Sequence, residues 1–158
     1  MTKEEFKAEL HEQLAPLLSS LRDVDMAKPD QVRDDLCSRF PLDTPDMQKL
    51  RELFRQGREK GFLCYREAGG VAFSRVQKAE AAGQWSIDAV HMSAPGPAHT
   101  HPNGEVDLCF AVDGQPLFDG NAAGWTVYGP GSSHAPTVTG GTMDILYFLP
   151  DGAIEFHR

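Results

Sequence analysis

The 158-residue chain is predicted to be a mostly β protein, a barrel or sandwich of short strands preceded by an N-terminal α-helical extension. Two patterns lead to this prediction. Apolar residues recur at helical spacing over residues 1–61, and short apolar segments bounded by glycine, proline and aspartate follow over residues 62–158. We therefore expect a helical extension over 1–61 and a β-barrel over 62–158, which together form one structural unit.

Three helices are expected in the N-terminal part. Thr2 and Glu5 form a T-x-x-E capping box ahead of an apolar stripe that reaches Leu21. A shorter second segment follows, and the pair Thr44-Pro45 marks the start of a third helix that ends at Gly61. These stripes are expected to pack against the barrel or against a second subunit, which favours a homodimer.

Short strands separated by turns are expected in the second part, a pattern typical of a sandwich or barrel. A barrel of about eight strands has room for one small ligand. The expected strands are Phe62–Tyr65, Val71–Gln77, Trp85–Met92, Val106–Val112, Trp125–Tyr128, Met143–Leu149 and Ile154–His157. The expected turns lie at Gly69-Gly70, Gly83, Asp113-Gly114, Asp119-Gly120, Gly140-Gly141 and Asp151-Gly152.

Composition excludes several classes of partner. A net charge of −8 argues against binding to nucleic acid or to an anionic membrane surface. No apolar run approaches the roughly 20 residues of a membrane span, and the first residues lack a secretion signal. Cys37, Cys64 and Cys109 fit a reducing cytoplasm. No dinucleotide, P-loop or G-x-S-x-G motif is present, so we expect no nucleotide or flavin cofactor.

Four side chains indicate a metal site. Residues i and i+2 of a strand point to the same side, so His99 and His101 can face one point, with Glu105 and His134 completing the set. Imidazole and carboxylate ligands suit a first-row divalent metal, and the sequence does not choose between iron, manganese and zinc. A His-x-His pair by itself is usually only a surface feature. The other two residues, within glycine-bounded strands, favour the metal site.

These residues form the pattern H-x-H-x3-E, followed about thirty residues later by G-x-x-H at Gly131–His134. The pattern resembles the two motifs of the cupin superfamily, and the resemblance covers residues 62–158. It implies a cupin-type β-barrel, a double-stranded β-helix or jelly roll. Two positions depart from the usual motifs, since Gly129 replaces a common proline and Val138 a common asparagine.

A narrower resemblance rests on the segments HTHPNGEVDLCF, GWTVYGPGSSHAPTV and ILYFLPDGAIEFH. With the helical N-terminal third, they resemble the small bacterial family that includes 4-hydroxylaminobenzoate lyase. The resemblance implies an ammonia-releasing carbon-nitrogen lyase that acts on a small aromatic carboxylate in nitroaromatic degradation. It would convert 4-hydroxylaminobenzoate to 3,4-dihydroxybenzoate (protocatechuate) and ammonia.

Further residues could shape the pocket around the metal. Arg66 or Arg75 could bind the substrate carboxylate, although a strand arginine taken singly is more often a solvated surface residue. Tyr128 and Tyr147 could bind the substrate through their hydroxyl groups, although a half-buried tyrosine in a strand usually only packs against its neighbours. His91 shares a face with Trp85, Ile87 and Ala89, expected to point inward, and could be a general acid or base or a satisfied core histidine.

Other functions remain open at this point. Glu105 could transfer protons instead of binding the metal. The same barrel could belong to another metal-dependent enzyme for small aromatic acids, a dioxygenase or isomerase, and oxygen consumption would reveal the dioxygenase. It could also be a non-catalytic small-molecule-binding protein, which would bind its ligand without forming product.

Overall fold

The computed structural model describes residues 1–81 and 83–157, in which three helices precede nine strands. The helices are α1 (Lys3–Leu21), α2 (Pro29–Arg39) and α3 (Pro45–Glu59). The strands are β1 (Arg66–Ala68), β2 (Val71–Gln77), β3 (Trp85–Met92), β4 (His99–His101), β5 (Glu105–Phe118), β6 (Gly124–Tyr128), β7 (Ser132–His134), β8 (Val138–Pro150) and β9 (Glu155–Phe156).

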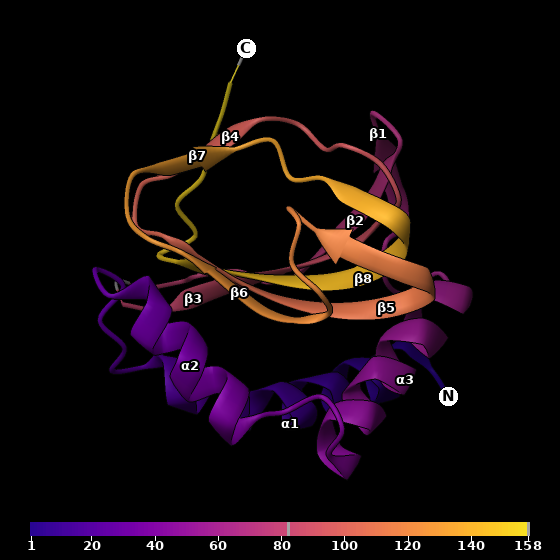
Figure 1. Cartoon of the computed structure of the whole chain (residues 1–158). Helices are drawn as coiled ribbons and strands as arrows, with labels where there is room; N and C mark the ends of the chain where they lie inside the picture. Colours follow the sequence, from indigo (N-terminus) through magenta and orange to yellow (C-terminus); the bar gives the residue numbers. More distant parts are fainter. Residues whose placement is uncertain (82, 158) are drawn as a thin grey trace.

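The strands form a barrel of two antiparallel sheets. The larger sheet has the order β1-β2-β3-β8-β5-β6 and the smaller one has the order β7-β4-β9. The smaller sheet lies across the larger one, and the three helices cover the opposite face of the larger sheet (Figure 1). The expected mostly β barrel with a helical N-terminal extension is therefore confirmed.

The helices begin where the sequence predicts. The hydroxyl of Thr2 accepts a hydrogen bond from the Glu5 amide at 3.1 Å. Thr44 caps α3 in the same way, accepting from the Met47 amide at 3.4 Å. These bonds satisfy amide groups that have no partner within the first turn of a helix. No helix among the described residues is long and apolar enough to cross a membrane.

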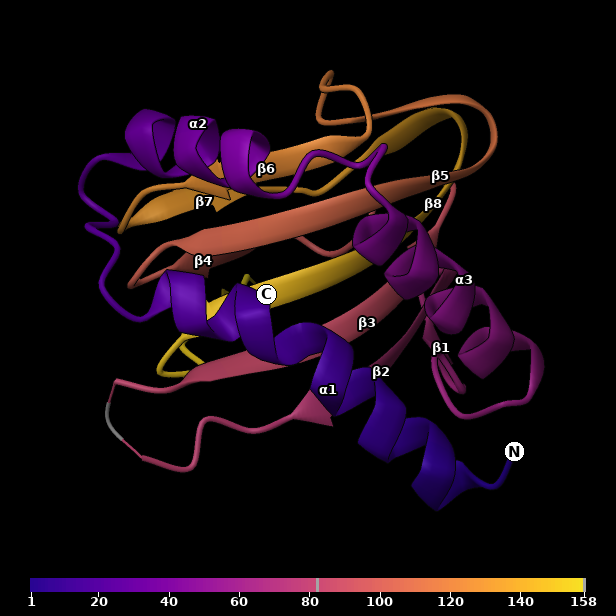
Figure 2. The ribbon, with the colours of Figure 1, turned by 90° about the horizontal axis from the view of Figure 1, so that it is seen from below.

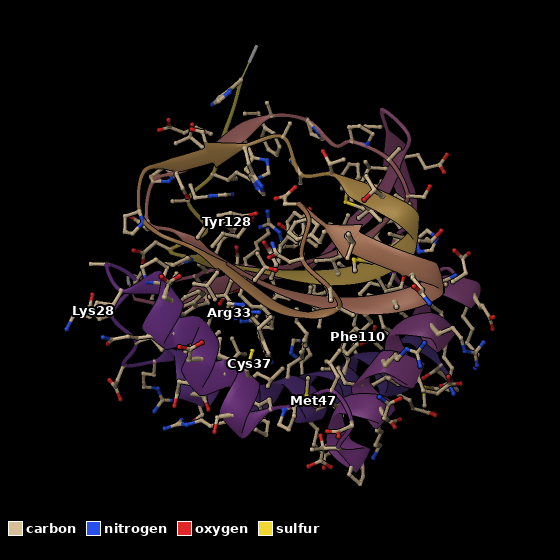
Figure 3. The ribbon with its side chains drawn as sticks, viewed as in Figure 1. Lys28, Arg33, Cys37, Met47, Phe110 and Tyr128 are labelled. Carbon is tan, nitrogen blue, oxygen red and sulfur yellow. The ribbon has the colours of Figure 1, made fainter. Side chains whose placement is uncertain are left out.

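The three helices lie over the outer face of the large sheet (Figure 2). Side chains of the helices and of this face form one apolar core. Phe54 of α3, Leu108 of β5 and Phe148 of β8 are buried together in it. In Figure 3, Phe110 and Met47 lie between the sheet and the helices. Full burial of side chains of this size stabilises the fold by about 1.5–3 kcal/mol each. The helical extension therefore covers a sheet face that would otherwise expose apolar side chains to water.

Alternation along β5 separates this core from the barrel interior. Val106, Leu108 and Phe110 belong to the core shared with the helices. Successive strand residues point to opposite faces, so the residues between them point into the barrel. Cys109 accordingly packs in a second cluster that contains Ile145 of β8.

One expected strand was wrong. Phe62–Tyr65 lies outside the strands, and β1 begins only at Arg66. The amide groups of Phe62 and Leu63 both donate to the Gly57 carbonyl, at 2.8 and 3.0 Å, which completes the C-terminal end of α3. Cys64 then adopts a φ of 55°, which an extended strand does not allow.

Two expected turns were also wrong. Asp113-Gly114 and Gly140-Gly141 lie inside β5 and β8, where Gly114 pairs with Gly141 and register shifts occur on either side. A Cβ atom at Gly141 would lie 2.2 Å from the Asp113 carbonyl oxygen, so these glycines allow two backbones to approach closely. The turns at Asp119-Gly120 and Asp151-Gly152 are present as predicted.

Candidate metal centre

Three strands bring the four predicted ligands together. His99 and His101 occupy the two ends of β4, Glu105 begins β5, and His134 ends β7. Because β4 pairs with β7, His99 lies directly opposite His134. One donor atom from each of the four residues lies within 4.8 Å of the other three. His99, His101 and Glu105 are buried, so the cluster lies inside the barrel.

The Nε2 atoms of the three imidazoles face the Glu105 carboxylate. Glu105 Oε2 lies 3.0 Å from His101 Nε2 and 3.5 Å from His134 Nε2. Glu105 Oε1 lies 3.7 Å from His99 Nε2. The Nε2 atoms of His134 and His99 are 3.1 Å apart. Three ring nitrogens and one carboxylate thus surround a common point.

The other ring nitrogen of each histidine is held by an acceptor. His99 Nδ1 donates to the Pro97 carbonyl at 3.0 Å. His101 Nδ1 lies 2.9 Å from the Ser132 hydroxyl, which donates its own proton to the Gly129 carbonyl and so accepts from the imidazole. With Nδ1 of these two rings directed at an acceptor, their Nε2 atoms are the ones that face the common point and are left for a metal.

The cluster also leaves buried atoms unsatisfied. His101 Nε2 and both carboxylate oxygens of Glu105 are buried and form no hydrogen bond. A buried polar group without a partner costs about 1–3 kcal/mol. A divalent cation at the common point would satisfy all three atoms, and a mixed set of three imidazoles and one carboxylate suits such an ion. The cluster therefore fits a metal site.

The surroundings of the cluster shift the pKa values of two candidate ligands and of a neighbouring aspartate. Burial would raise the pKa of Glu105, but the surrounding imidazoles, chiefly His101 and His134, hold it well below its ordinary value. Burial opposes a charge on His134, yet its contacts with Asp119 and Glu105 raise its pKa from 6.5 to about 9. Burial, reinforced by the charge of Glu105, raises the pKa of Asp107 well above its ordinary value.

A cavity of about 630 Å³ opens beside the cluster. His99 lies in its wall, together with Arg66, Arg75 and Tyr147, three of the four residues predicted to bind substrate. The guanidinium of Arg75 forms an ion pair with Asp88. Arg66 lies over the ring of Tyr65, 6.0 Å from its centroid. The cavity therefore joins the metal site to cationic groups on β1 and β2.

The two predicted tyrosines occupy different places. Tyr128 lies inside the barrel (Figure 3), where its ring stacks on His101 with centroids 5.5 Å apart. Its hydroxyl donates to the Asp119 carboxylate. Tyr147 is buried in the cavity wall, and its hydroxyl lies 3.7 Å from the sulfur of Met92. Tyr128 thus contacts a candidate ligand, and Tyr147 borders the space beside the cluster.

His91 lies away from the cluster. The expectation that its face of β3 points into the barrel was wrong, because Ile87 and Ala89 of that face pack in the core shared with the helices. His91 Nδ1 lies 2.6 Å from the Asp144 carboxylate, which also accepts from Arg58 of α3 at 3.1 Å. The geometry gives His91 a role in joining α3 to the sheet.

Several residues of the site were not predicted. Asp119 contacts His134 at 2.6 Å, but its Asp-Gly sequence indicated only a turn. Ser132 contacts His101 at 2.9 Å, but the sequence marked it only as a spacer within the G-x-x-H pattern. The ring of Phe156 on β9 lies 5.6 Å from that of His99 and lines the cavity. Asp107 was detectable, since it is a charged residue in an apolar strand, two positions after Glu105.

An antiparallel barrel that carries H-x-H-x3-E on β4 and β5 and a third histidine on the neighbouring β7 defines a cupin-type protein. Solved structures similar to this one include an RmlC-like cupin from Ralstonia eutropha JMP134, 14% identical with a TM-score of 0.41, covering 58% of this chain and 62% of that chain. Salicylate 1,2-dioxygenase from Pseudaminobacter salicylatoxidans is 12% identical with a TM-score of 0.41, covering 69% and 36%.

The sequence defines the family more narrowly. The family model of 4-hydroxylaminobenzoate lyase (PnbB) matches residues 12–156, and the chain belongs to this family. The 4-hydroxylaminobenzoate lyase of Pseudomonas putida is 29% identical over 133 residues, covering 72% of this chain and 76% of that protein. The enzyme of the same name from Nocardioides sp. (strain LMS-CY) is 29% identical over 120 residues, covering 69% and 71%.

Proposed function

We propose that the protein is a lyase that converts 4-hydroxylaminobenzoate to 3,4-dihydroxybenzoate and ammonia at a metal site inside the barrel. The observation that carries the proposal is the cluster of three inward-facing Nε2 atoms and one carboxylate beside a cavity with cationic walls. Membership of the 4-hydroxylaminobenzoate lyase family supports this choice of substrate.

The metal would be held by the Nε2 atoms of His99, His101 and His134 and by the Glu105 carboxylate. A divalent ion (iron, manganese or zinc) would supply Lewis acidity and lower the pKa of bound water toward about 7. The pairing of each Nδ1 with an acceptor fixes the rings in the orientation that this binding needs. We assign Glu105 as a ligand rather than a free base, because neither of its buried oxygens has another partner.

The substrate carboxylate would bind at the cationic wall of the cavity. Arg75 already shares its charge with the Asp88 carboxylate, which would repel a second anion. Arg66 contacts the ring of Tyr65 and forms no ion pair with the residues that the structure describes. We therefore assign the carboxylate to Arg66, whose planar guanidinium can bind both oxygens. The aromatic ring would then lie between Arg66 and the cluster, beside Phe156.

The proposed reaction balances without an external oxidant or reductant. The hydroxylamine oxygen leaves as water when the N–O bond breaks, and one water adds to the ring carbon beside the nitrogen. A second water replaces the nitrogen at its own ring carbon, and ammonia leaves. The net change consumes one water, the nitrogen is reduced, and the ring is oxidised.

An anaerobic product assay tests this proposal. Protein loaded in turn with Fe²⁺, Mn²⁺ or Zn²⁺ is incubated with 4-hydroxylaminobenzoate, and 3,4-dihydroxybenzoate and ammonia are quantified. We expect equal amounts of both products without oxygen, and loss of turnover and of bound metal in His101→Ala. A product that requires oxygen would favour the dioxygenase alternative, and tight binding without product would favour a binding protein.

We also propose that the reaction takes place in the cytoplasm as a step of nitroaromatic degradation. Cys37, Cys64 and Cys109 are all free thiols, which is consistent with a reducing compartment.

A further inference from the structure

Asp119 connects three segments around the metal centre. It follows the last residue of β5 and adopts a φ of 49° in the turn before β6. Its Oδ2 accepts hydrogen bonds from His134 Nδ1 at 2.6 Å and from the hydroxyl of Tyr128. Its Oδ1 accepts from the amide of Thr137 at 2.9 Å. One carboxylate therefore contacts a candidate ligand, the residue stacked on a second ligand, and the backbone that leads into β8.

The backbone around Asp119 fixes the position of this carboxylate. The amide of Asp119 donates to the Thr137 carbonyl at 2.9 Å, so these two residues are joined in both directions. Phe118 and Asn121 exchange amide-to-carbonyl bonds of 2.7 and 2.8 Å across the turn. A carboxylate held in this way has little freedom to follow a moving imidazole, so the imidazole must follow the carboxylate.

Both partners of Asp119 affect the geometry of the metal centre. A protonated Nδ1 directed at Asp119 leaves Nε2 of His134 as the atom that faces Glu105, 3.5 Å away. The Tyr128 ring, held by its hydroxyl, covers His101 and lies 4.5 Å from the ring of His134. Carboxylates paired with metal-binding histidines in this way orient the ring and make it a stronger ligand.

We propose that Asp119 is a positioning residue of the metal centre, which sets the orientation of His134 directly and that of His101 through Tyr128. The inference rests on the proposed metal site but not on the proposed reaction. Asp119 is expected to determine how tightly the site binds a metal, and it need not touch the substrate.

Asp151 provides a matched control within the same chain. It also precedes a glycine in a turn, adopts a φ of 55°, and accepts a backbone hydrogen bond, from the Gly83 amide at 2.7 Å. Asp151 has no contact with the four candidate ligands among the described residues. Replacing each aspartate by asparagine removes one carboxylate from an equivalent turn, but only Asp119→Asn changes the partner of a candidate ligand.

The test is the Zn²⁺ affinity of the wild-type protein, Asp119→Asn and Asp151→Asn, measured by competition with a chromophoric chelator. We expect Asp119→Asn to bind Zn²⁺ about 10–100-fold more weakly, and Asp151→Asn to match the wild type. Tyr128→Phe, which keeps the Asp119–His134 contact, should weaken binding less than Asp119→Asn does. The melting temperature of each metal-free variant separates loss of folded protein from loss of affinity.

A spectroscopic measurement tests the contact itself. In NMR spectra of Zn²⁺-loaded protein labelled with ¹⁵N-histidine, we expect a strongly deshielded Nδ1–H proton of His134 in the wild type and in Asp151→Asn. The chemical shift of this proton should change in Asp119→Asn. Equal Zn²⁺ affinity and unchanged signals in Asp119→Asn would overturn the inference. Absence of Zn²⁺ binding in wild type would overturn it together with the metal site, whereas tight Zn²⁺ binding without lyase turnover would refute only the proposed reaction.

Discussion

The two faces of the large sheet are built from the same strands, but they differ in whether their buried side chains include polar atoms without hydrogen-bond partners. On the face toward the helices, Leu108 and Phe148 are completely buried among other apolar side chains. On the face toward the barrel interior, Glu105, Asp107 and Thr126 are also buried, yet each has a side-chain oxygen without a hydrogen-bond partner. Successive residues of β5 therefore alternate between the apolar core under the helices and the polar interior of the barrel.

This difference indicates how stability and chemistry are divided within the sheet. Apolar burial on the helix side stabilises the fold and can offset the cost of unsatisfied polar groups on the interior side. Substitutions on the two faces should therefore have separable effects. Changes inside the barrel should alter metal binding and turnover, and changes on the helix side should alter the free energy of unfolding.

The largest effect is expected for Glu105→Gln inside the barrel. The substitution removes the only carboxylate in the candidate ligand set and keeps the size of the side chain. We expect metal affinity and kcat/KM to fall by more than about 100-fold, because partners outside the ligand set already contribute ~10–100-fold. Metal analysis and steady-state kinetics check this. A variant that keeps bound metal but loses turnover would instead make Glu105 a proton-transfer residue.

On the other face, Leu108→Ala should destabilise the fold without affecting the metal. Leu108 is fully buried between the sheet and the helices, so truncation leaves a cavity. The free energy of unfolding should fall by about 2–5 kcal/mol, as measured by urea denaturation of the metal-free protein. Metal affinity of the folded variant should match the wild type, and a large loss would contradict the separation of the two faces.

A smaller effect is expected at the cationic wall of the cavity. Arg66→Met should raise KM for 4-hydroxylaminobenzoate by about 10-fold or more, because a hydrogen bond to a charged group contributes ~1.5–3 kcal/mol. The double substitution Arg75→Met/Asp88→Asn, which removes the other guanidinium without leaving an unpaired carboxylate in the cavity, is the matched comparison. Metal content should stay unchanged in both variants. A larger KM increase in the double variant would assign the substrate carboxylate to Arg75 instead.

The smallest effect is expected for His91→Gln on the helix side. Losing the contact with Asp144 should lower the free energy of unfolding by about 0.5–1.5 kcal/mol, because Arg58 still pairs with that carboxylate. Turnover should remain within about twofold of wild type, since His91 lies across the sheet from the cluster. A large fall in kcat with normal stability would restore His91 as a candidate acid or base.

Local patterns were enough to predict much of the fold and most of the candidate ligand set. Strand periodicity places His99 and His101 on the same side of β4 without knowledge of the rest of the chain. The bounds of β2 and β3 also follow from local alternation. The assignment of His134 as a ligand required the spacing of a known motif, because its position beside His99 depends on the pairing of β4 with β7.

Other features depend on tertiary structure and could not be predicted locally. Alternation shows that His91 and Ile87 share a face of β3, but not that helices cover that face. The pair Asp113-Gly114 has the composition of a turn, yet it lies within a strand pair that needs small residues for close approach. Asp119 does occupy a turn, and its contact with His134 arises only when the barrel closes.

The most direct test of the central claim is anomalous X-ray diffraction from crystals of the Zn²⁺-loaded protein. We predict a single strong peak per chain, about 2.0–2.2 Å from the three Nε2 atoms and a Glu105 oxygen. A peak elsewhere, coordination through Nδ1, or no peak in protein that is otherwise folded would contradict a metal centre at these four residues.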